Sequence, residues 1–235
     1  MSFNLQKCEF LRITLKKNPI VVQYTLHDYT IHEVTHAKYL GVVIDSKLSW
    51  SEHIKQVTNK ANKVKGFLQR NLYNCPISIK TNCYKSMIKP IVEYACTIWA
   101  PHTQKDIAAI ESVQRRAARF VCNNYSSFTS VNALLSYLQW PTLEHCRNQL
   151  KALTMFKIVH NLIDVPSNTL LKPATSDHYT RGHTAKFQRP FTRVDSYRYS
   201  FIPSAIKIWN SLPQDLINCT NINLFKQKLA SLASI

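Results

Sequence analysis

KYLGVVIDSKLSWSEHI, residues 38–54, changes its hydrophobic period near its middle. Up to Ile44 it is a run of β-branched and aromatic residues, typical of a strand and interrupted by Gly41. From Ser51 onward the apolar residues follow a helical spacing, with Ser51 as the expected N-cap. The stretch therefore predicts a junction between a sheet and a helix. Asp45 at this junction is either a catalytic carboxylate or a turn residue, and its position at a strand end favours the turn.

The residues before this junction read as short strands. CEFLRITL (8–15) is followed by the turn signal KKNP, and VVQYTL and HDYTIHEV follow before the run 38–44. Short strands with short connections are typical of antiparallel pairing. We therefore expect a small antiparallel sheet over residues 1–50, which is marginal on its own and requires a neighbouring element.

The residues after the junction read as helices almost to the end of the chain. The first expected helix starts at 51 and buries a stripe through Ile54, Ala61 and Leu68, and the second starts at Pro76 and is kinked or divided near Lys89 by Pro90. Further helices are expected over 104–121, 130–138 and 141–163, and two more near 202–212 and 221–232. We predict an α+β chain with a sheet at 1–50, a helical domain at 51–163, a linker at 164–177 and a C-terminal basic and aromatic helical region at 178–235.

The charge of the chain points to an anionic partner. Thirty Lys and Arg oppose 13 Asp and Glu, a formal net charge of +17. Residues 1–50 carry only 6 of the basic and 4 of the acidic side chains. Most of the positive charge therefore belongs to the region after the junction. Nucleic acid is a commoner partner of such a surface than a membrane is.

Cysteine usage and the N-terminus bear on the compartment. Seven cysteines form an odd number without close pairs, so we expect reduced and mostly buried thiols. The first ten residues lack the pattern of a signal peptide, and no apolar run is long enough to span a membrane. We expect an intracellular protein, nuclear or cytoplasmic, that is neither secreted nor bound to a membrane.

The acidic and histidine residues predict no catalytic or metal site. Divalent-metal chemistry needs at least two carboxylates close together, whereas these carboxylates are scattered singly and no D-D or D-x-D pair occurs. His27, His32 and His36 alternate poorly with a strand, and no cysteine joins them at zinc-finger spacing. We predict no catalytic residue, no metal ligand and no cofactor in this chain.

Three basic features are candidates for nucleic-acid binding. The polar face of the first helix presents small, amide and cationic side chains to a phosphate backbone, and the alternative is a solvated helix face. The second feature is an arginine cluster, in which Glu111 could instead pair with Arg115. The third is the stretch 178–201, where cations alternate with aromatic rings suited to unpaired bases; the equally weighted alternative is a strand with buried rings. The residues concerned are Lys55, Asn59, Lys63, Gly66 and Arg70; Arg115, Arg116 and Arg119; and Arg181, Lys186, Arg189 and Arg193.

Several blocks together resemble one family. In order they are FNLQKCEFL (3–11), KYLGVVIDSKLSWSEHI (38–54), IKPIVEYACTIWAP (88–101), QRRAARF (114–120), and RGH followed by FIPSAIKIWNSLP (201–213). They resemble the C-terminal part of reverse transcriptases from non-LTR retrotransposons of the LINE-like Jockey, CR1 and RTE type. The Y-L-G and W-N-S-L-P blocks are specific in combination, although each alone is weak.

The resemblance implies a primer grip and a thumb. The hairpin that ends in Y-L-G would be the primer grip, which places Tyr39, Leu40 and Gly41 near the primer terminus. The following helices would form the thumb, with Lys55, Lys63 and Arg70 facing the template–primer duplex. Absence of Cβ at Gly41 would let its backbone approach another chain closely. The implied partner is RNA or an RNA/DNA hybrid, together with the palm and fingers that precede these blocks in the family.

The resemblance also implies an activity that this chain lacks by itself. The family polymerises DNA on RNA with magnesium, but its F-A-D-D-type metal motif lies upstream of the blocks found here. We therefore expect a truncated protein that binds nucleic acid and is inactive alone. The alternative is a non-catalytic protein-interaction module or a decayed retroelement remnant without independent function. A metal-dependent hydrolase would need two converging carboxylates, which nothing in the sequence requires.

Overall fold

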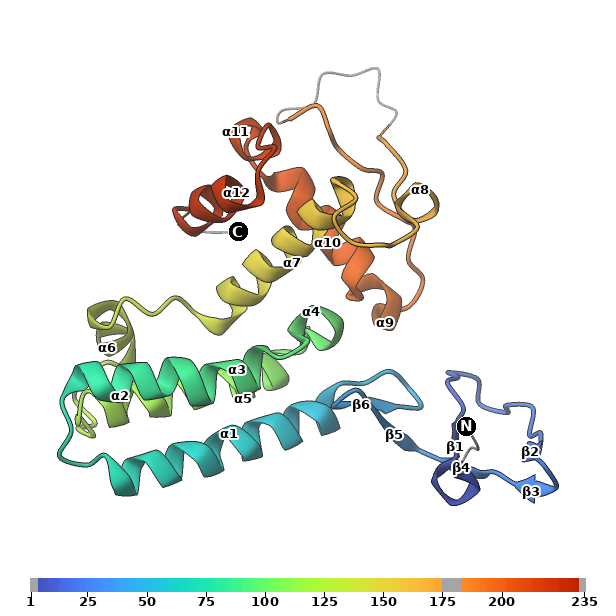
Figure 1. Ribbon diagram of the computed structural model, residues 1–235, viewed down its shortest axis with the longest axis horizontal. Helices are drawn as coiled ribbons and strands as arrows, with labels where there is room; N and C mark the ends of the chain where they lie inside the picture. Colours follow the sequence, from blue (N-terminus) through green and yellow to red (C-terminus); the bar gives the residue numbers. More distant parts are fainter. Residues whose placement is uncertain (1–3, 175–182, 233–235) are drawn as a thin grey trace.

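The computed structural model describes residues 4–174 and 183–232. Figure 1 shows short strands near the N-terminus, a lower lobe of helices beside them and an upper lobe formed by the C-terminal helices. This arrangement confirms the α+β class. Within the described ranges, no helix combines the length and the apolar character that a membrane crossing requires.

The strands form three separate two-stranded ladders. β2 (Thr25–Leu26) pairs antiparallel with β3 (Tyr29–Thr30), and β5 (His36–Tyr39) pairs antiparallel with β6 (Val42–Asp45). β1 (Glu9–Leu11) pairs parallel with β4 (His32–Val34), so the expectation of purely antiparallel pairing was wrong for this ladder. A parallel partner is possible because 20 residues separate the two strands and can carry the chain back to the same edge.

The candidate strands were also predicted too long. In the segment 12–24 no residue is assigned to a strand, although Ile13, Leu15 and Ile20 have strong strand propensity. These side chains are 53%, 61% and 79% exposed. Propensity alone does not hold a strand that has neither a pairing partner nor a buried face. A short 3₁₀ turn, η1 (Leu5–Lys7), precedes β1.

The lower lobe contains the long helix α1 (Ser51–Asn71) and a broken helix that follows it. The latter consists of α2 (Ile77–Cys83), the π-helix η2 (Tyr84–Ile88) and α3 (Lys89–Glu93). The division falls at Lys89, as Pro90 predicts, because Pro90 has no N–H to donate to the preceding turn. Ala95, at a φ of +50°, then separates α3 from α4 (Cys96–Trp99).

Two further helices complete the lower lobe. α5 (Gln104–Val121) and α6 (Val131–Tyr137) lie within one residue of their predicted bounds. Helices α1 and α5 pack along one another, with Ile54, Ala61, Ile110 and Ala117 almost completely buried between the helices of this lobe. The 3–4 spacing of apolar residues therefore marked the correct buried faces.

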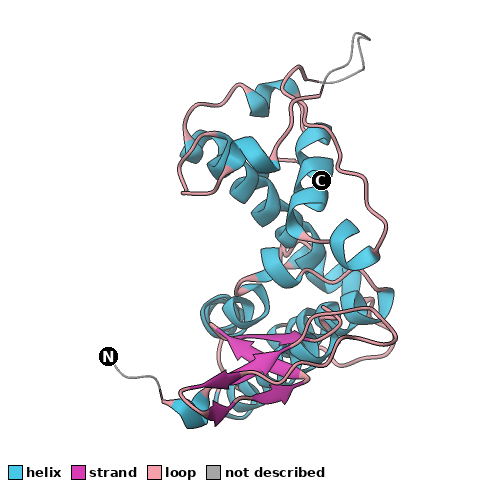
Figure 2. Cartoon of the chain, turned by 90° about the vertical axis from the view of Figure 1, so that its right-hand side faces the viewer, coloured by secondary structure: helices cyan, strands magenta, loops and turns pink. Residues whose placement is uncertain are grey.

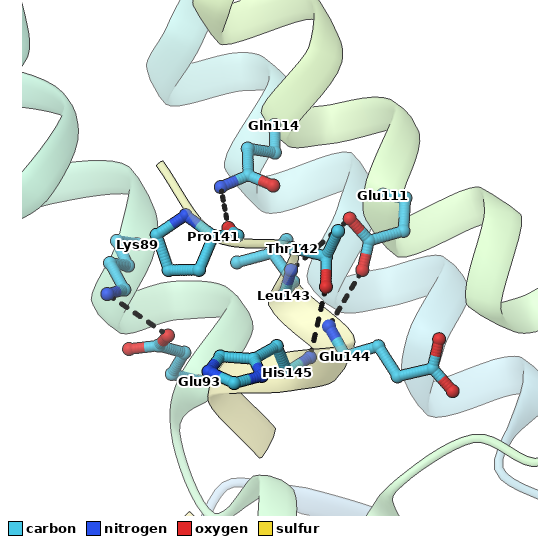
Figure 3. Close-up of polar contacts among 9 residues, drawn as sticks. All are labelled: Lys89, Glu93, Glu111, Gln114, Pro141, Thr142, Leu143, Glu144 and His145. Carbon is cyan, nitrogen blue, oxygen red and sulfur yellow. Dashed lines mark hydrogen bonds and ion pairs between the residues drawn. The ribbon is translucent and has the colours of Figure 1, made fainter. Parts of the chain in front are cut away.

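Helix α7 (Leu143–Val159) joins the two lobes. Its first turn belongs to the lower core through Leu143, whereas Met155 and Phe156 belong to the upper core. Figure 3 shows how this helix starts on α5: Glu111 accepts hydrogen bonds from the backbone N–H groups of Leu143 and Glu144 at 3.3 and 2.8 Å. Gln114 donates to the carbonyl of Pro141 at 2.9 Å. Two side chains of α5 thus fix the direction in which α7 leaves the lower lobe.

The upper lobe is built around α7 and α10 (Phe201–Ser211). Short helices α8 (Ser167–Leu170), α9 (Asp195–Arg198) and α11 (Gln214–Ile217) connect to the terminal α12 (Ile222–Ala230). Phe156, Trp209 and Phe225 form its centre, each at most 1% exposed. The boundaries 1–50, 51–163, 164–177 and 178–235 stay a prediction, although α7 contributes to both cores.

The seven cysteines are free thiols. Only Cys96, Cys146 and Cys219 are buried, and the other four are partly exposed, so the prediction of mostly buried thiols was wrong. Burial raises the pKa of the Cys96 thiol to about 11, which keeps it protonated at neutral pH.

Candidate nucleic-acid interface

The β5–β6 hairpin places the predicted primer-grip residues at its exposed tip. Tyr39 pairs with Val42, so Leu40 and Gly41 form a two-residue turn in which both have positive φ, +45° and +84°. Such a turn matches the natural twist of a hairpin and requires left-handed backbone at both positions. Tyr39 and Leu40 are 67% and 74% exposed. The tip therefore presents an aromatic ring and an apolar side chain to solvent.

Tyr94 holds this tip from the end of α3, a role that reasoning from the sequence missed. Its hydroxyl donates to the carbonyl of Leu40 at 2.9 Å. A Cβ added to Gly41 would lie 3.3 Å from Cε1 of Tyr94. The positive φ and the Tyr94 ring both require a glycine at position 41. The close approach of a primer, which the resemblance implies, is a separate reason for the same residue. Tyr94 stands inside one of the resembling blocks, but no local pattern indicates a contact 54 residues away.

His53 fixes the hairpin to α1, and Asp45 orders the turn between them. Val43 donates its backbone N–H to Nδ1 of His53 at 3.2 Å, and the His53 ring packs edge-on against Trp99 with centroids 5.0 Å apart. Burial lowers the pKa of His53, which favours the neutral ring that accepts this hydrogen bond. Asp45 accepts from the N–H groups of Lys47 and Ser49 at 2.8 and 2.9 Å, which confirms that it is a turn residue.

Ser51 does not cap α1 as expected. The N-cap is Trp50, and Ser51 is the first helical residue, with its hydroxyl donating to Asp106 at 2.8 Å. Asp106 also accepts from the Thr103 hydroxyl at 2.9 Å at the start of α5. The hydroxyl was used for a contact between two helices because α5 brings a buried carboxylate to this point. His53 was likewise missed, since a lone histidine in a helix carries no signal of its partner.

The polar face of α1 is exposed as predicted. Lys55, Asn59, Lys63 and Arg70 are exposed, and Gly66 lies between them. Asn59, Asn62, Lys63, Gly66 and Arg70 line a shallow open hollow on this surface. Lys55 lies 4.0 Å from Glu52, an exposed pair that holds its side chain only weakly. The structure therefore brings all five predicted α1 residues onto one solvent-facing surface.

The three arginines of α5 differ in what they contact. The guanidinium of Arg119 donates to the carbonyls of Asn124, Ser126 and Thr129 at 3.3, 2.8 and 3.3 Å, so it holds the loop before α6. Arg116 donates to Ser112 of its own helix. Burial, followed by the charge of Arg116, lowers the pKa of Lys65 on α1. Arg115 is exposed. The predicted pairing of Arg115 with Glu111 is not formed, because Glu111 contacts α7 and lies 3.7 Å from Arg147.

The basic and aromatic stretch lies in the upper lobe, away from α1 (Figure 1). Phe187 packs into the upper core beside Trp209, whereas Phe191 is 83% exposed with the guanidinium of Arg193 6.0 Å from its ring. One ring of this stretch is therefore packed and another is exposed, and nucleic-acid binding by the stretch stays a prediction. Arg189 and Arg193 are exposed and Lys186 is half-buried, while Arg181 lies outside the described residues.

That this chain holds no metal ion stays a prediction, and the observations that bear on it concern residues 4–174 and 183–232. No group of three or more His, Cys, Asp and Glu side chains is placed there to hold a metal ion. Asp45 accepts a hydrogen bond in the turn before α1, and Asp106 accepts one at the start of α5. Glu33 pairs with Arg12 at 3.0 Å. These carboxylates serve local structure.

Comparison with known proteins relates the chain to transposon polymerases. It is 27% identical over 124 residues to the probable RNA-directed DNA polymerase from transposon X-element of Drosophila melanogaster, which covers 52% of this chain and 14% of that protein. It is 25% identical over 139 residues to the probable RNA-directed DNA polymerase from transposon BS of the same organism, covering 56% and 15%. The chain is related to transposon RNA-directed DNA polymerases.

The match to these RNA-directed DNA polymerases is partial in both directions. It covers about half of this chain and about one seventh of each polymerase. An uncharacterised Caenorhabditis elegans protein is 26% identical over 132 residues, which is 53% of this chain and 61% of that protein. No protein-family model and no solved structure matches the chain.

Proposed function

We propose that this chain is the primer-grip, thumb and C-terminal part of a reverse transcriptase of the non-LTR type, and that it binds RNA or an RNA/DNA duplex without cleaving or extending it. The observation that carries the proposal is the exposed face of α1, with Lys55 in its first turns and Lys63 and Arg70 lining the hollow at Gly66. Relatedness to transposon RNA-directed DNA polymerases supports the partner class.

The geometry of this face suits a phosphate backbone. Cations on one side of a helix form point contacts to phosphates, and an amide such as Asn59 donates to phosphate oxygens. The absence of a side chain at Gly66 leaves room for a backbone to lie against the helix. The β5–β6 hairpin, with Tyr39 and Leu40 at its tip, is fixed to the start of α1 through His53. In this proposal, a duplex that lies along α1 meets the hairpin tip at the N-terminal end of the helix.

Polymerisation in this proposal belongs to the longer polymerases. The chain matches about one seventh of each polymerase, and its described carboxylates form no metal-binding group. We expect the chain alone, with magnesium, deoxynucleotides and a primed RNA template, to incorporate no nucleotide above a buffer control. Incorporation above that control would contradict this part of the proposal.

The binding proposal is tested by a salt titration with an RNA/DNA hybrid. Each phosphate contact should contribute about −0.9 to the slope of log K against log salt concentration. Lys63→Ala should lower affinity for all sequences alike and reduce the slope by about 1. Lys60→Ala is the matched control, because Lys60 is an exposed lysine of the same helix that does not line the hollow. Equal effects of the two substitutions, or a flat salt response, would refute the assignment of this face.

A second candidate function is protein contact through the segment 13–24. Ile20 and Val21 are each 79% exposed, and Leu15 is 61% exposed. Adjacent exposed apolar side chains of this kind mark association surfaces. In the proposed setting their partner is the palm and fingers of a longer polymerase. If the surface is uncovered in the isolated chain, light scattering should show association that grows with concentration and that is abolished by I20S combined with V21S.

A further inference from the structure

The upper lobe contains a hollow of about 430 Å³ between α8, the segment 186–191 and α9, which we call the α8–α9 pocket. Its volume lies within the range typical of small-molecule sites. Six of its lining residues carry the chemistry considered below: Lys172, Gln188, Arg189, Phe191, Tyr197 and Ser200. The elements that form the pocket belong to the upper lobe, whereas α1 belongs to the lower lobe (Figure 1). Figure 2, turned by 90°, shows the two groups of helices one above the other.

Backbone hydrogen bonds hold the wall of this pocket. Ala174 donates to the carbonyl of Lys186 at 2.9 Å, and Gln188 donates to the carbonyl of Lys172 at 2.8 Å. The side-chain amide of Asn210, on α10, bonds both the N–H and the carbonyl of Phe187, at 3.0 and 2.8 Å. The segment 186–188 is therefore fixed to the upper core, and Arg189 and Phe191 follow an anchored backbone.

The aromatic rings of the pocket are more exposed than packing requires. Phe191 is 83% exposed and Tyr197 is 46% exposed, whereas the neighbouring Phe187 packs into the core. Leaving a phenylalanine in water forgoes the free energy that its burial provides. A flat ligand stacked on these rings would recover part of it, and Arg193 beside Phe191 adds a cation near the same face.

The charge around the pocket selects an anionic ligand. Lys172 and Arg189 line it, one from each segment of the hydrogen-bonded wall, and neither forms an ion pair among the described residues. Asp195 is the only acidic residue between His183 and Ile202. A ligand with a flat ring and a negative charge meets both requirements, and a nucleotide is the common biological molecule with this combination.

We propose that the α8–α9 pocket binds one unpaired nucleotide of a single-stranded nucleic acid. The base stacks on Phe191 and Tyr197, the adjoining phosphate contacts Lys172 and Arg189, and Gln188 and Ser200 offer polar groups to the base edge. This goes beyond the duplex proposal, because it assigns a second site with a different form of nucleic acid on the other lobe. The two sites would let one molecule hold a duplex and an unpaired strand together.

The test measures the anisotropy of a fluorescein-labelled ten-nucleotide oligouridine. Phe191→Ala should weaken binding about tenfold, in line with the loss of one stacked base, and Phe191→Tyr should retain binding because it keeps a ring. Phe128→Ala is the matched control, since Phe128 is 99% exposed but lies in the loop before α6. An abasic strand of equal length should bind the wild-type protein about as weakly as oligouridine binds the Phe191→Ala protein.

A cross-link maps the site directly. A strand that contains 5-iodouracil, irradiated on the wild-type protein, should attach to a peptide that contains Phe191 or Tyr197. Comparison of oligouridine with oligothymidine and with free uridine monophosphate shows whether RNA, DNA or the isolated nucleotide is preferred, and all three share the proposed chemistry.

Two results would overturn the proposal. One is an affinity that falls equally for Phe128→Ala and Phe191→Ala, and the other is an abasic strand that binds as tightly as oligouridine. Failure of the duplex proposal is distinguishable, because Lys63→Ala should change hybrid binding and leave the cross-link to the α8–α9 pocket unchanged.

Discussion

At the scale of single residues, the two described glycines are expected to respond in opposite ways to the same substitution. Gly41 has a φ of +84° and faces the Tyr94 ring at 3.3 Å from a built Cβ, whereas Gly66 is helical and its built Cβ meets only the flexible end of Arg70 at 3.6 Å. One glycine is required by the backbone of the hairpin, and the other leaves open space on α1.

We predict that Gly41→Ala lowers the free energy of unfolding by about 1–3 kcal/mol, because alanine is strained at this φ and crowds Tyr94. Gly66→Ala should raise it by about 0.5–1 kcal/mol, because alanine costs less backbone entropy in a helix. Urea unfolding of both variants checks the signs. If Gly66→Ala also weakens hybrid binding, the hollow is used by the ligand; a stabilised protein with unchanged affinity would show that it is not.

Lys151 makes stability depend on pH in an unusual window. It is 7% exposed on α7, and burial, followed by repulsion from Arg147, lowers its pKa to about 8, while Cys96 and Glu144 act in the opposite direction. Between about pH 8 and its ordinary pKa of 10.5, the unfolded chain binds a proton that the folded chain does not. The contribution of Lys151 to stability is therefore unfavourable below pH 8 and improves as the pH rises through this window.

Lys151→Met should stabilise the protein at pH 7 by on the order of 2–3 kcal/mol, because methionine fills the space without a buried charge. The gain over wild type should shrink towards zero as the pH rises from about 8 to 10.5. Chemical unfolding of both proteins across this pH range gives the difference between their unfolding free energies. The cysteines titrate in both proteins, so their contribution largely drops out of that difference. Lys226→Met, at an exposed site on α12, should show no such pH dependence. A gain for Lys151→Met that is constant with pH would contradict the assignment.

At the scale of elements, α5 separates arginines that support the fold from those available to a ligand. Arg119 satisfies three loop carbonyls, and Arg115 is exposed. The sequence predicted them as one cluster, since helical spacing places residues on a face but does not show what the next loop brings to that face. The longer helices were predictable from apolar periodicity and from Pro90, whereas η2, the break at Ala95 and the short helices α8, α9 and α11 were not.

We predict that Arg119→Ala costs about 1–3 kcal/mol of stability, because carbonyls of the 122–130 loop lose their donor. Arg115→Ala should leave the unfolding free energy within about 0.5 kcal/mol of wild type and weaken hybrid binding. Thermal unfolding and the hybrid titration separate the two effects. The reverse pattern, with Arg115 stabilising and Arg119 neutral, would refute this division.

At the scale of the whole molecule, the two lobes are joined through α7 and the carboxylate of Glu111. This side chain accepts from two N–H groups at the start of α7 (Figure 3). It also lies 3.7 Å from the buried guanidinium of Arg147. A second contact between the lobes is the stacking of His102, beyond α4, on Tyr199, after α9, at 4.4 Å. The placement of the α8–α9 pocket relative to the α1 face depends on this joint.

Glu111→Ala should cost about 3–5 kcal/mol, because it removes the partner of a buried arginine and the acceptor for two helix N-terminal donors. Hydrogen exchange in the first turn of α7 should accelerate with it. Glu144→Ala is the matched control, since Glu144 lies in the same first turn but is exposed. Equal losses from the two substitutions would show that the joint does not depend on this carboxylate.

The α+β class, the buried stripes of α1 and α5, the exposed cations of α1 and the turn role of Asp45 all followed from the order of residues. These features are local: apolar period, strand ends and turn residues express the physics of neighbours within a few positions. The parallel pairing of β1 with β4, the contact of Tyr94 with Leu40, the use of Ser51 by Asp106 and the placement of Phe191 outside the core did not follow. Each depends on which distant surface folds against a segment, and that is settled by packing of the whole chain rather than by local propensity.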